Sequence, residues 1–421
     1  MLPAATDSRE NLFPQWRFEI RFLLGHLGTT GFSQDLDPAY LILPDGFDWE
    51  YLLATASLHG VLPLFFRSIS KSGPGSVPTA ILERTRREYG VISRRNFIFA
   101  QELLRLLAYL NDHGIAVVPY KGAPLAEMAY GDLSLRQFSD LDILVRPADV
   151  FNAKRLLEEQ GYQTRFIYGR RPLSQLTPAE TATFIKYRHE FEMQRKDGLL
   201  IDLHWQLAPR HYPFRLATGP LWERSETVAF AGRSISSFGR EDLVLILCMH
   251  GAKDRWKKLI WIIDLTRIIV NDRALDWDSI FSRARDAHME LPLLLGLQLV
   301  EDLFAPDMPS RVDRGRESRD QIARLARTIF AELFRENKRP ERFPVRLLHL
   351  RLCRDFNDKL SYSWQAFFVP RVGDWAVVRL PAWLYPLYYV LRPFHILGIW
   401  AWSSIRSRLK EQQRSTDRKQ L

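Results

Sequence analysis

The sequence predicts an α+β fold, in which a small mixed sheet is flanked by helical regions on its N- and C-terminal sides. Apolar residues recur at three- and four-residue spacing through the first part of the chain. Short apolar strands then alternate with helices, and helical spacing returns from Arg240 onward. We expect four regions, which are a helical region at 1–110, an α/β domain at 111–230, a helical domain at 231–340 and an aromatic-rich, basic segment at 341–421.

The first region is predicted to consist of helices joined by a loop. Helical spacing of apolar residues covers Trp16–Leu27, Trp49–Leu64 and Ile98–Leu110. Lys71–Pro78 is rich in Gly, Pro and Ser, which is typical of a loop.

The second region contains the strands. Short apolar runs predict strands at Ile115–Tyr120 and Leu141–Val145, and a helix follows at Phe151–Gln160. A Lys-Asp-Gly turn separates Phe191–Arg195 from Leu199–Trp205, a pattern typical of a hairpin.

Helical periodicity defines the third region, with a charged loop expected at Pro306–Asp320. The predicted helices are Glu241–His250, Leu259–Val270, Asp278–Ala287, Leu291–Phe304 and Ile322–Arg335.

Composition indicates a folded, basic protein. Of its 421 residues, 46% are hydrophobic and 26% are charged, which excludes a mostly disordered chain. The formal net charge of +10 favours a polyanionic partner, which is nucleotide phosphate, nucleic acid or anionic lipid. The two cysteines lie far apart, and the first residues lack the apolar stretch of a signal peptide. We therefore expect a cytoplasmic location.

Two carboxylates stand where the strand at Leu141–Val145 begins. Because side chains alternate along a strand, Asp140 and Asp142 point to the same face, about 6–7 Å apart. Neighbouring carboxylates repel each other unless a cation lies between them, and oxygen ligands at this spacing suit Mg²⁺ or Mn²⁺. An isolated Asp-x-Asp is common, however, and one carboxylate often caps a turn while the other is solvated.

A third carboxylate favours the metal interpretation. Asp202 shares one face of its strand with His204, whereas Ile201, Leu203 and Trp205 share the other. An Asp-x-Asp strand beside a strand with one further Asp is what two-metal phosphoryl or nucleotidyl transfer needs. His204 is either a substrate contact or an ordinary strand histidine. The histidines and cysteines show no His-x-x-x-His or Cys-x-x-Cys pattern, which argues against zinc.

A candidate phosphate-binding turn precedes these carboxylates. Lys121-Gly122-Ala123 follows a strand and leads into a helix, so backbone N–H groups there can point at an anion. Arg136 lies four residues before Asp140 and has the charge to neutralise a triphosphate or the carboxylates. Taken alone, the Lys-Gly pair is equally compatible with an ordinary turn.

This order of motifs resembles the polymerase-beta-type nucleotidyltransferase superfamily. It is most similar to a bacterial family of uncharacterised nucleotidyltransferases, over about residues 50–290. The residues that carry the resemblance are Lys121-Gly122, Tyr130, Arg136, Asp140-Leu141-Asp142-Ile143, Asp202-Leu203-His204-Trp205, and the flanking His59–Leu64, His250-Gly251 and Trp256–Leu265. In one respect the chain departs from the superfamily, because Ala123 stands where a Gly or Ser usually follows the first glycine.

The resemblance implies a metal-dependent enzyme that moves a nucleoside monophosphate from an NTP to a hydroxyl acceptor and releases pyrophosphate. Asp140, Asp142 and Asp202 would then bind Mg²⁺ or Mn²⁺. The triphosphate would be held by Lys121, Gly122, Ala123 and Arg136. Two alternatives stay open, a catalytically silent scaffold of the same fold that binds a nucleotide or a partner, and a basic nucleic-acid-binding protein. The acceptor can be a sugar, a lipid-linked glycan, a protein hydroxyl or RNA.

The C-terminal segment suggests a membrane surface. Pro381–Trp402 is apolar and aromatic, but three prolines, Arg392 and His395 interrupt it, and a basic tail follows. We expect both the body of the protein and the basic tail to lie in the cytoplasm. A single membrane span between them would place them on opposite sides, so we do not expect one. We expect residues 381–421 to lie on an anionic membrane surface, at the inner face of the cytoplasmic membrane, or to pack on the protein itself.

Overall fold

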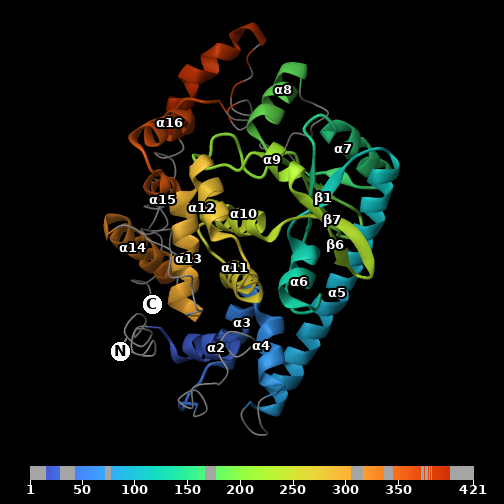
Figure 1. The fold of residues 1–421 in the computed structure, drawn as a ribbon, viewed down its shortest axis with the longest axis vertical. Helices are drawn as coiled ribbons and strands as arrows, with labels where there is room; N and C mark the ends of the chain where they lie inside the picture. The colour runs from blue at the N-terminus through green and yellow to red at the C-terminus, as the bar shows by residue number, and fades with distance from the viewer. Residues whose placement is uncertain are drawn as a thin grey trace, which may run out of the picture.

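A five-stranded mixed sheet lies within an otherwise helical chain, which confirms the predicted α+β fold class. The computed structural model describes residues 16–28, 43–71, 77–165, 177–304, 316–335, 345–370, 374, 378, 380 and 382–398. Figure 1 shows the sheet between the long helix α5 (Thr79–Asp112) on one side and helices α10 (Arg240–Lys253) and α11 (Leu259–Asn271) on the other.

The sheet has the strand order β1-β2-β5-β4-β3, and its neighbours are antiparallel except β2 and β5, which run parallel. This register places Asp142 directly opposite Asp202. The strands are β1 Val117–Pro119, β2 Leu141–Val145, β3 Gln163–Thr164, β4 Glu190–Gln194 and β5 Leu200–His204. A separate hairpin, β6 Ser225–Phe230 and β7 Arg233–Phe238, was not expected from the sequence.

The N-terminal helices differ from the prediction in one respect. The single helix expected at Trp49–Leu64 is wrong, because the chain breaks at Gly60, whose φ is +72°. A Cβ at Gly60 would lie 3.3 Å from Cγ2 of Ile260, so the close approach of another helix also favours glycine there. The helices are α2 Phe18–Gly28, α3 Trp49–Leu58, α4 Leu62–Ile69 and α5 Thr79–Asp112.

The remaining helices pack around and beyond the sheet. Those of the central part are α6 Gly122–Tyr130, α7 Val150–Glu159, α8 Pro178–Tyr187 and α9 Thr218–Glu223. Those that follow are α10 Arg240–Lys253, α11 Leu259–Asn271, α12 Trp277–Asp286, α13 Glu290–Phe304, α14 Arg316–Leu333, α15 Val345–Leu352, α16 Phe356–Phe367 and the 3₁₀ helix η4 Ala382–Leu387.

The two faces of the sheet contribute to different cores. Ile143, Ile201 and Leu203 are buried with residues of α5, α6 and α7. On the opposite face, Leu144 joins the larger core formed by the N-terminal helices and α10–α14. Since side chains alternate along a strand, Asp142 and Asp202 share the face of Leu144.

The described part of the C-terminal segment packs one side on the protein. Residues 388–398 are helical, and Tyr388, Arg392 and Ile396, four residues apart, are buried. Arg392 pairs with Asp374, Nη1 to Oδ2 at 2.6 Å. Among the residues that the structure describes, no helix has both the length and the apolar character to cross a membrane.

Candidate functional site

The paired strands β2 and β5 bring two of the predicted carboxylates together. Asp142 and Asp202 are opposite each other, and His204 lies two residues further along β5. One ligand atom from each of these three side chains lies within 4.8 Å of the others. Asp140 precedes β2 by one residue, is partly exposed, and interacts electrostatically with Asp142. The geometry is therefore that of a carboxylate and imidazole cluster on one face of the sheet.

Lys121 reaches this cluster from the end of β1. Its Nζ lies 2.9 Å from Oδ1 of Asp142, and both side chains are largely buried. The next residue, Gly122, starts α6 with a φ of +57°, and a Cβ there would be 3.3 Å from the carbonyl oxygen of Asp140. Glycine is thus required where the turn passes the start of β2.

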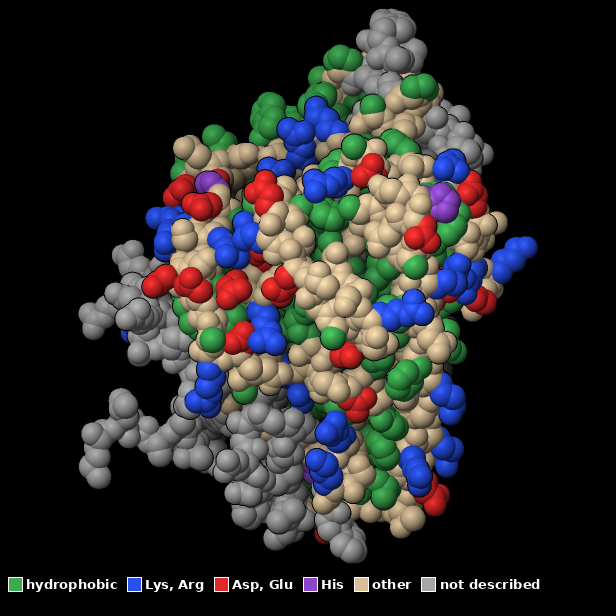
Figure 2. All heavy atoms as spheres, turned by 45° about the vertical axis from the view of Figure 1, so that its right-hand side comes forward, with side chains coloured by type: hydrophobic (Ala, Val, Ile, Leu, Met, Phe, Trp, Pro, Cys, Tyr) green, Lys and Arg blue, Asp and Glu red, His purple; other side chains and the backbone are tan. Residues whose placement is uncertain are grey.

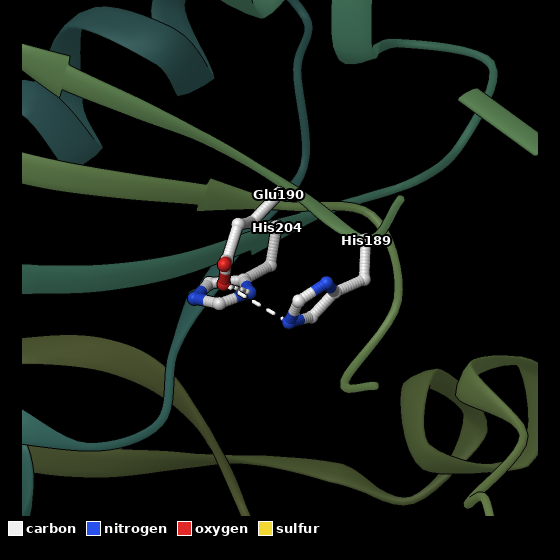
Figure 3. Close-up of side chains that lie close together, drawn as sticks. All are labelled: His189, Glu190 and His204. Atoms are coloured by element: carbon white, nitrogen blue, oxygen red, sulfur yellow. Dashed lines mark ion pairs between the residues drawn. The ribbon is translucent and has the colours of Figure 1, made fainter. Parts of the chain in front are cut away.

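His204 lies between two carboxylates. Its Nε2 is 3.1 Å from Oδ1 of Asp142, and its Nδ1 is 3.3 Å from Oε2 of Glu190. Figure 3 shows His189 on the other side of the same Glu190 carboxylate, with Nε2 at 3.1 Å from Oε2. Sequence reasoning missed His189 and Glu190. The Lys-Asp-Gly turn was the available signal, because its register pairs Glu190 with His204.

The electrostatics of the two central carboxylates are opposite. Burial alone would raise the pKa of Asp142, but the Lys121 charge and the His204 hydrogen bond hold that pKa well below its usual range. Burial, followed by the charges of Asp142 and Glu190, raises the pKa of Asp202 to about 8. The pKa of Asp140 is also raised, by burial and by Asp142. The carboxylates of the cluster therefore have more potential negative charge than the neighbouring cationic side chains neutralise.

Arg136 is engaged elsewhere. Its guanidinium forms a bidentate pair with Asp264 of α11, with Nε to Oδ1 and Nη2 to Oδ2 both at 2.8 Å. The hydroxyl of Tyr130 donates to the same carboxylate at 2.6 Å. Nη1 of Arg136 approaches the carbonyl oxygen of Gly122 at 3.5 Å. Arg136 therefore lies behind the glycine turn and ties it to α11, a partner that the sequence did not reveal.

The C-terminal end of α10 faces the same cluster. His250 is within electrostatic range of Lys121 and Asp142, and Lys253 is within range of His189 and Glu190. Burial lowers the pKa of His189 to about 4, so its imidazole is neutral near pH 7. Asp140, Asp142 and Asp202 interact electrostatically with Lys121, and Glu190 does so with Lys253. Carboxylate oxygens of this kind fit a divalent cation.

A cavity of about 450 Å³ lies elsewhere, between α6, β6 and the start of α10. Glu127, Glu226, Glu241 and Asp272 give it an acidic lining. None of the predicted metal- or nucleotide-binding residues lines it. The candidate site is therefore the carboxylate cluster, where Lys121, Asp142 and Asp202 lie together.

Comparison with known protein families gives one match. A protein-family model described as "Uncharacterised nucleotidyltransferase" matches residues 45–305. No curated protein shows significant similarity to the chain. Among solved structures, an antigenic nucleotidyltransferase-like protein from Paracoccidioides brasiliensis is similar, with 15% identity and a TM-score of 0.28. That match covers 54% of this chain and 96% of the other.

Proposed function

The chain belongs to the family described as uncharacterised nucleotidyltransferases, and we propose that it transfers a nucleoside monophosphate from an NTP to a hydroxyl acceptor. The observation that supports this most is the pairing of Asp142 with Asp202 on parallel neighbouring strands. Together with His204, they offer ligand atoms within 4.8 Å of one another. A silent scaffold would have no need of such a costly group of buried carboxylates.

In this proposal Asp140, Asp142 and Asp202 hold Mg²⁺ or Mn²⁺. When bound, the metal supplies charge neutralisation for the triphosphate and a lowered pKa for the acceptor hydroxyl. Lys121 now neutralises Asp142 at 2.9 Å. We expect its ammonium to turn toward the triphosphate once a metal takes over the carboxylate, with the backbone N–H groups of Gly122 and Ala123 at the start of α6 beside it.

The proposed transfer joins the acceptor oxygen to the α-phosphorus and breaks the bond from that phosphorus to the bridging oxygen. The bond's electron pair leaves with pyrophosphate. Asp202 is proposed to complete the metal site beside the acceptor hydroxyl, whose proton would be released to solvent as its oxygen attacks. His204 orients Asp142, and Arg136, which is held by Asp264, positions the glycine turn by donating to the carbonyl oxygen of Gly122.

The test uses each of the four NTPs, labelled at either the α- or the γ-phosphate, with Mg²⁺ and a cell extract as the source of acceptor. We expect α-label, and not γ-label, to enter a macromolecule or small acceptor. Asp142→Asn should reduce this transfer at least about a hundredfold, because it removes a metal ligand without changing volume. Glu192→Gln, an exposed residue opposite Asp202, is the matched control.

If the wild-type protein transfers no α-label from any NTP, the enzyme proposal fails. NTP binding without transfer would then favour the scaffold alternative. Loss of labelled product on nuclease treatment would identify RNA as the acceptor, and stability to nuclease would direct the search to glycans or protein hydroxyls.

We further propose that the protein works at an anionic membrane surface, at the inner face of the cytoplasmic membrane. The outer sides of two helical segments support this. Along α16, Phe356, Leu360 and Trp364 are more than half exposed. Within 388–398, Val390 and Phe394 are exposed opposite the buried side. Figure 2 shows hydrophobic side chains at the upper end of the molecule, with Lys and Arg just below them.

Cations adjoin this apolar surface. Lys186, Arg210 and Arg215 line a cavity of about 290 Å³ together with Gln365 of α16 and Val369. Basic and apolar side chains side by side are typical of proteins that bind anionic lipid.

The membrane test compares sedimentation with phosphatidylglycerol and phosphatidylcholine vesicles. Wild-type protein should bind the anionic vesicles and dissociate in high salt, because salt screens the attraction. Val390→Asp and Phe394→Asp should abolish binding, whereas Phe151→Asp, on an exposed site of α7, should not. Equal binding by all three variants, or none by wild type, would contradict the proposal.

A further inference from the structure

Beside the carboxylate cluster lies a second group of metal-ligand type, formed by His189, Glu190 and His204. The three side chains come from the start of β4 and the end of β5, which pair antiparallel. Figure 3 shows both imidazole rings directed at the Glu190 carboxylate. One ligand atom from each residue lies within 4.8 Å of the other two.

Both histidines are buried, and the hydrogen-bonding capacity of their ring nitrogens is not fully satisfied. His189 is 4% exposed and His204 is 2% exposed. Neither ring nitrogen of His189, nor Nδ1 of His204, makes a hydrogen bond of proper geometry within the described structure. Buried polar atoms without a partner are unusual because each carries a desolvation cost. Two of these nitrogens, Nε2 of His189 and Nδ1 of His204, face the same Glu190 carboxylate, and together they indicate an absent binding partner.

The distances suit a metal ion. Glu190 Oε2 lies 3.1 Å from Nε2 of His189 and 3.3 Å from Nδ1 of His204. Zinc–ligand bonds of about 2.0–2.1 Å at a tetrahedral angle separate two ligand atoms by roughly 3.3 Å. An ion can therefore enter with only small movements of these side chains.

We propose that His189, Glu190 and His204 form a binding site for a divalent transition-metal ion of the zinc type, distinct from the Mg²⁺ site of the carboxylate cluster. Two imidazoles and one carboxylate favour zinc and its first-row neighbours over Mg²⁺, which prefers oxygen ligands. Three protein ligands also leave one coordination position open. The spacing of these residues along the chain forms no metal-binding motif, because the ligands meet only through the strand pairing that the Lys-Asp-Gly turn sets.

The proposed site is connected to the carboxylate cluster through His204. An ion on Nδ1 requires the ring proton to be on Nε2, and that nitrogen is 3.1 Å from Oδ1 of Asp142. The imidazole would then donate a hydrogen bond to Asp142, as metal-bound histidines commonly do to a carboxylate. The transition metal would thereby position Asp142 without contacting the nucleotide.

The binding experiment uses the full-length protein, freed of metal with a chelator and of any affinity tag. Co²⁺ is titrated in excess Mg²⁺ and without NTP, its visible absorption is followed, and Zn²⁺ is then used to displace it. We expect one Co²⁺ per chain at this site, fully displaced by Zn²⁺. Because no NTP or acceptor is present, the result is independent of whether the chain transfers nucleotides.

Two variants and one control locate the ion. His189→Gln and Glu190→Gln should each weaken Zn²⁺ binding at least about a hundredfold, since each removes a direct ligand. His288→Gln is the control, because His288 lies in an exposed group with Asp355 and Asp358 that also has metal-ligand types. It should leave the tight binding unchanged. Unaltered binding in both His189→Gln and Glu190→Gln would overturn the proposal.

A measurement on wild-type protein avoids any folding defect of the variants. Anomalous diffraction at the zinc edge, from crystals grown with Zn²⁺ and Mg²⁺, should place a peak among His189, Glu190 and His204. A peak only between Asp142 and Asp202, only at His288, or at no site would refute the assignment.

Discussion

At the residue scale, the site is defined by two neighbouring carboxylates with opposite properties. Lys121 and His204 keep Asp142 ionised, whereas burial and the charges around Asp202 raise its pKa to about 8. In the metal-free protein Asp142 is therefore an anion at neutral pH, whereas Asp202 is mostly protonated there. Both contribute to pH-dependent stability, with opposite signs.

The stability of the metal-free protein should reflect Asp202. Its pKa is about 8 in the folded chain and about 3.9 when unfolded, so the native state binds the extra proton between these values. The contribution of Asp202 to the free energy of unfolding therefore falls as pH rises from about 4 to 8. Asp202→Asn should be more stable than wild type at about pH 9, with the difference shrinking toward about pH 4.

Urea unfolding with a chelator present measures this difference. Asp112→Asn, at an exposed position at the end of α5, controls for the loss of a carboxylate in general. If the free energy of unfolding of wild type instead increases relative to that of Asp202→Asn as pH rises, the fold stabilises Asp202 as an anion. That result would contradict the geometry.

We expect the main contribution of Arg136 to be to the stability of the fold and not to nucleotide binding. Its guanidinium and the Asp264 carboxylate are both buried, with side-chain exposures of 7% and 0%. Arg136→Met leaves Asp264 uncompensated and should lower the free energy of unfolding by about 3–5 kcal/mol. The double change Arg136→Met with Asp264→Leu should recover much of that loss. Full stability in Arg136→Met, with only NTP affinity reduced, would restore the role of a nucleotide contact.

At the element scale, local patterns predicted much of the architecture. The strand expected at Leu141–Val145 has those bounds, and both hairpin strands are within one residue of their predicted limits. Their apolar runs are bounded by turn residues, which makes local sequence informative. The β6–β7 hairpin was missed because most of its residues are polar and exposed on one face.

Pairing between elements required the structure. Sequence motifs predicted four of the site residues, and the structure brings these together: Lys121, Asp142, Asp202 and His204. Asp264 lies 128 residues from Arg136 in the chain, so no local pattern joins them.

Helix packing beside the site depends on Trp256. The chain turns between α10 and α11 with a φ of +51° at this fully buried residue. A Cβ on Gly251 would lie 2.5 Å from Cδ2 of the indole, and one on Gly296 would lie 3.1 Å from Cζ2. The ring therefore fits between α10 and α13 because both helices have glycine there.

Gly251→Ala should destabilise the protein by about 1–3 kcal/mol through overpacking. Gly219→Ala, at a helical position with no atom within 4 Å of the added Cβ, should have little effect. Thermal unfolding of the two variants compares them directly. Equal melting temperatures would mean that the indole can move aside without cost.

At the scale of the whole molecule, the sheet joins two cores. Its α5–α7 face is buried in one, and its carboxylate face is turned toward α10 and the larger helical core. The site thus lies where the strand region meets the helical body, with Lys253 and His250 supplied by the latter. Its geometry accordingly depends on the packing of both parts, which is why distant changes such as Gly251→Ala should also weaken metal binding.

The central claim, that the carboxylates of β2 and β5 hold a metal–nucleotide complex, can be measured without knowledge of the acceptor. Electron paramagnetic resonance of Mn²⁺ reports free ion as it is titrated with NTP into wild type, Asp142→Asn and Glu192→Gln. We predict that wild type and Glu192→Gln lower the free Mn²⁺ concentration further than the same amount of NTP does without protein, and that Asp142→Asn lowers it no further than NTP alone. The same uptake of Mn²⁺ by Asp142→Asn as by wild type would contradict the account.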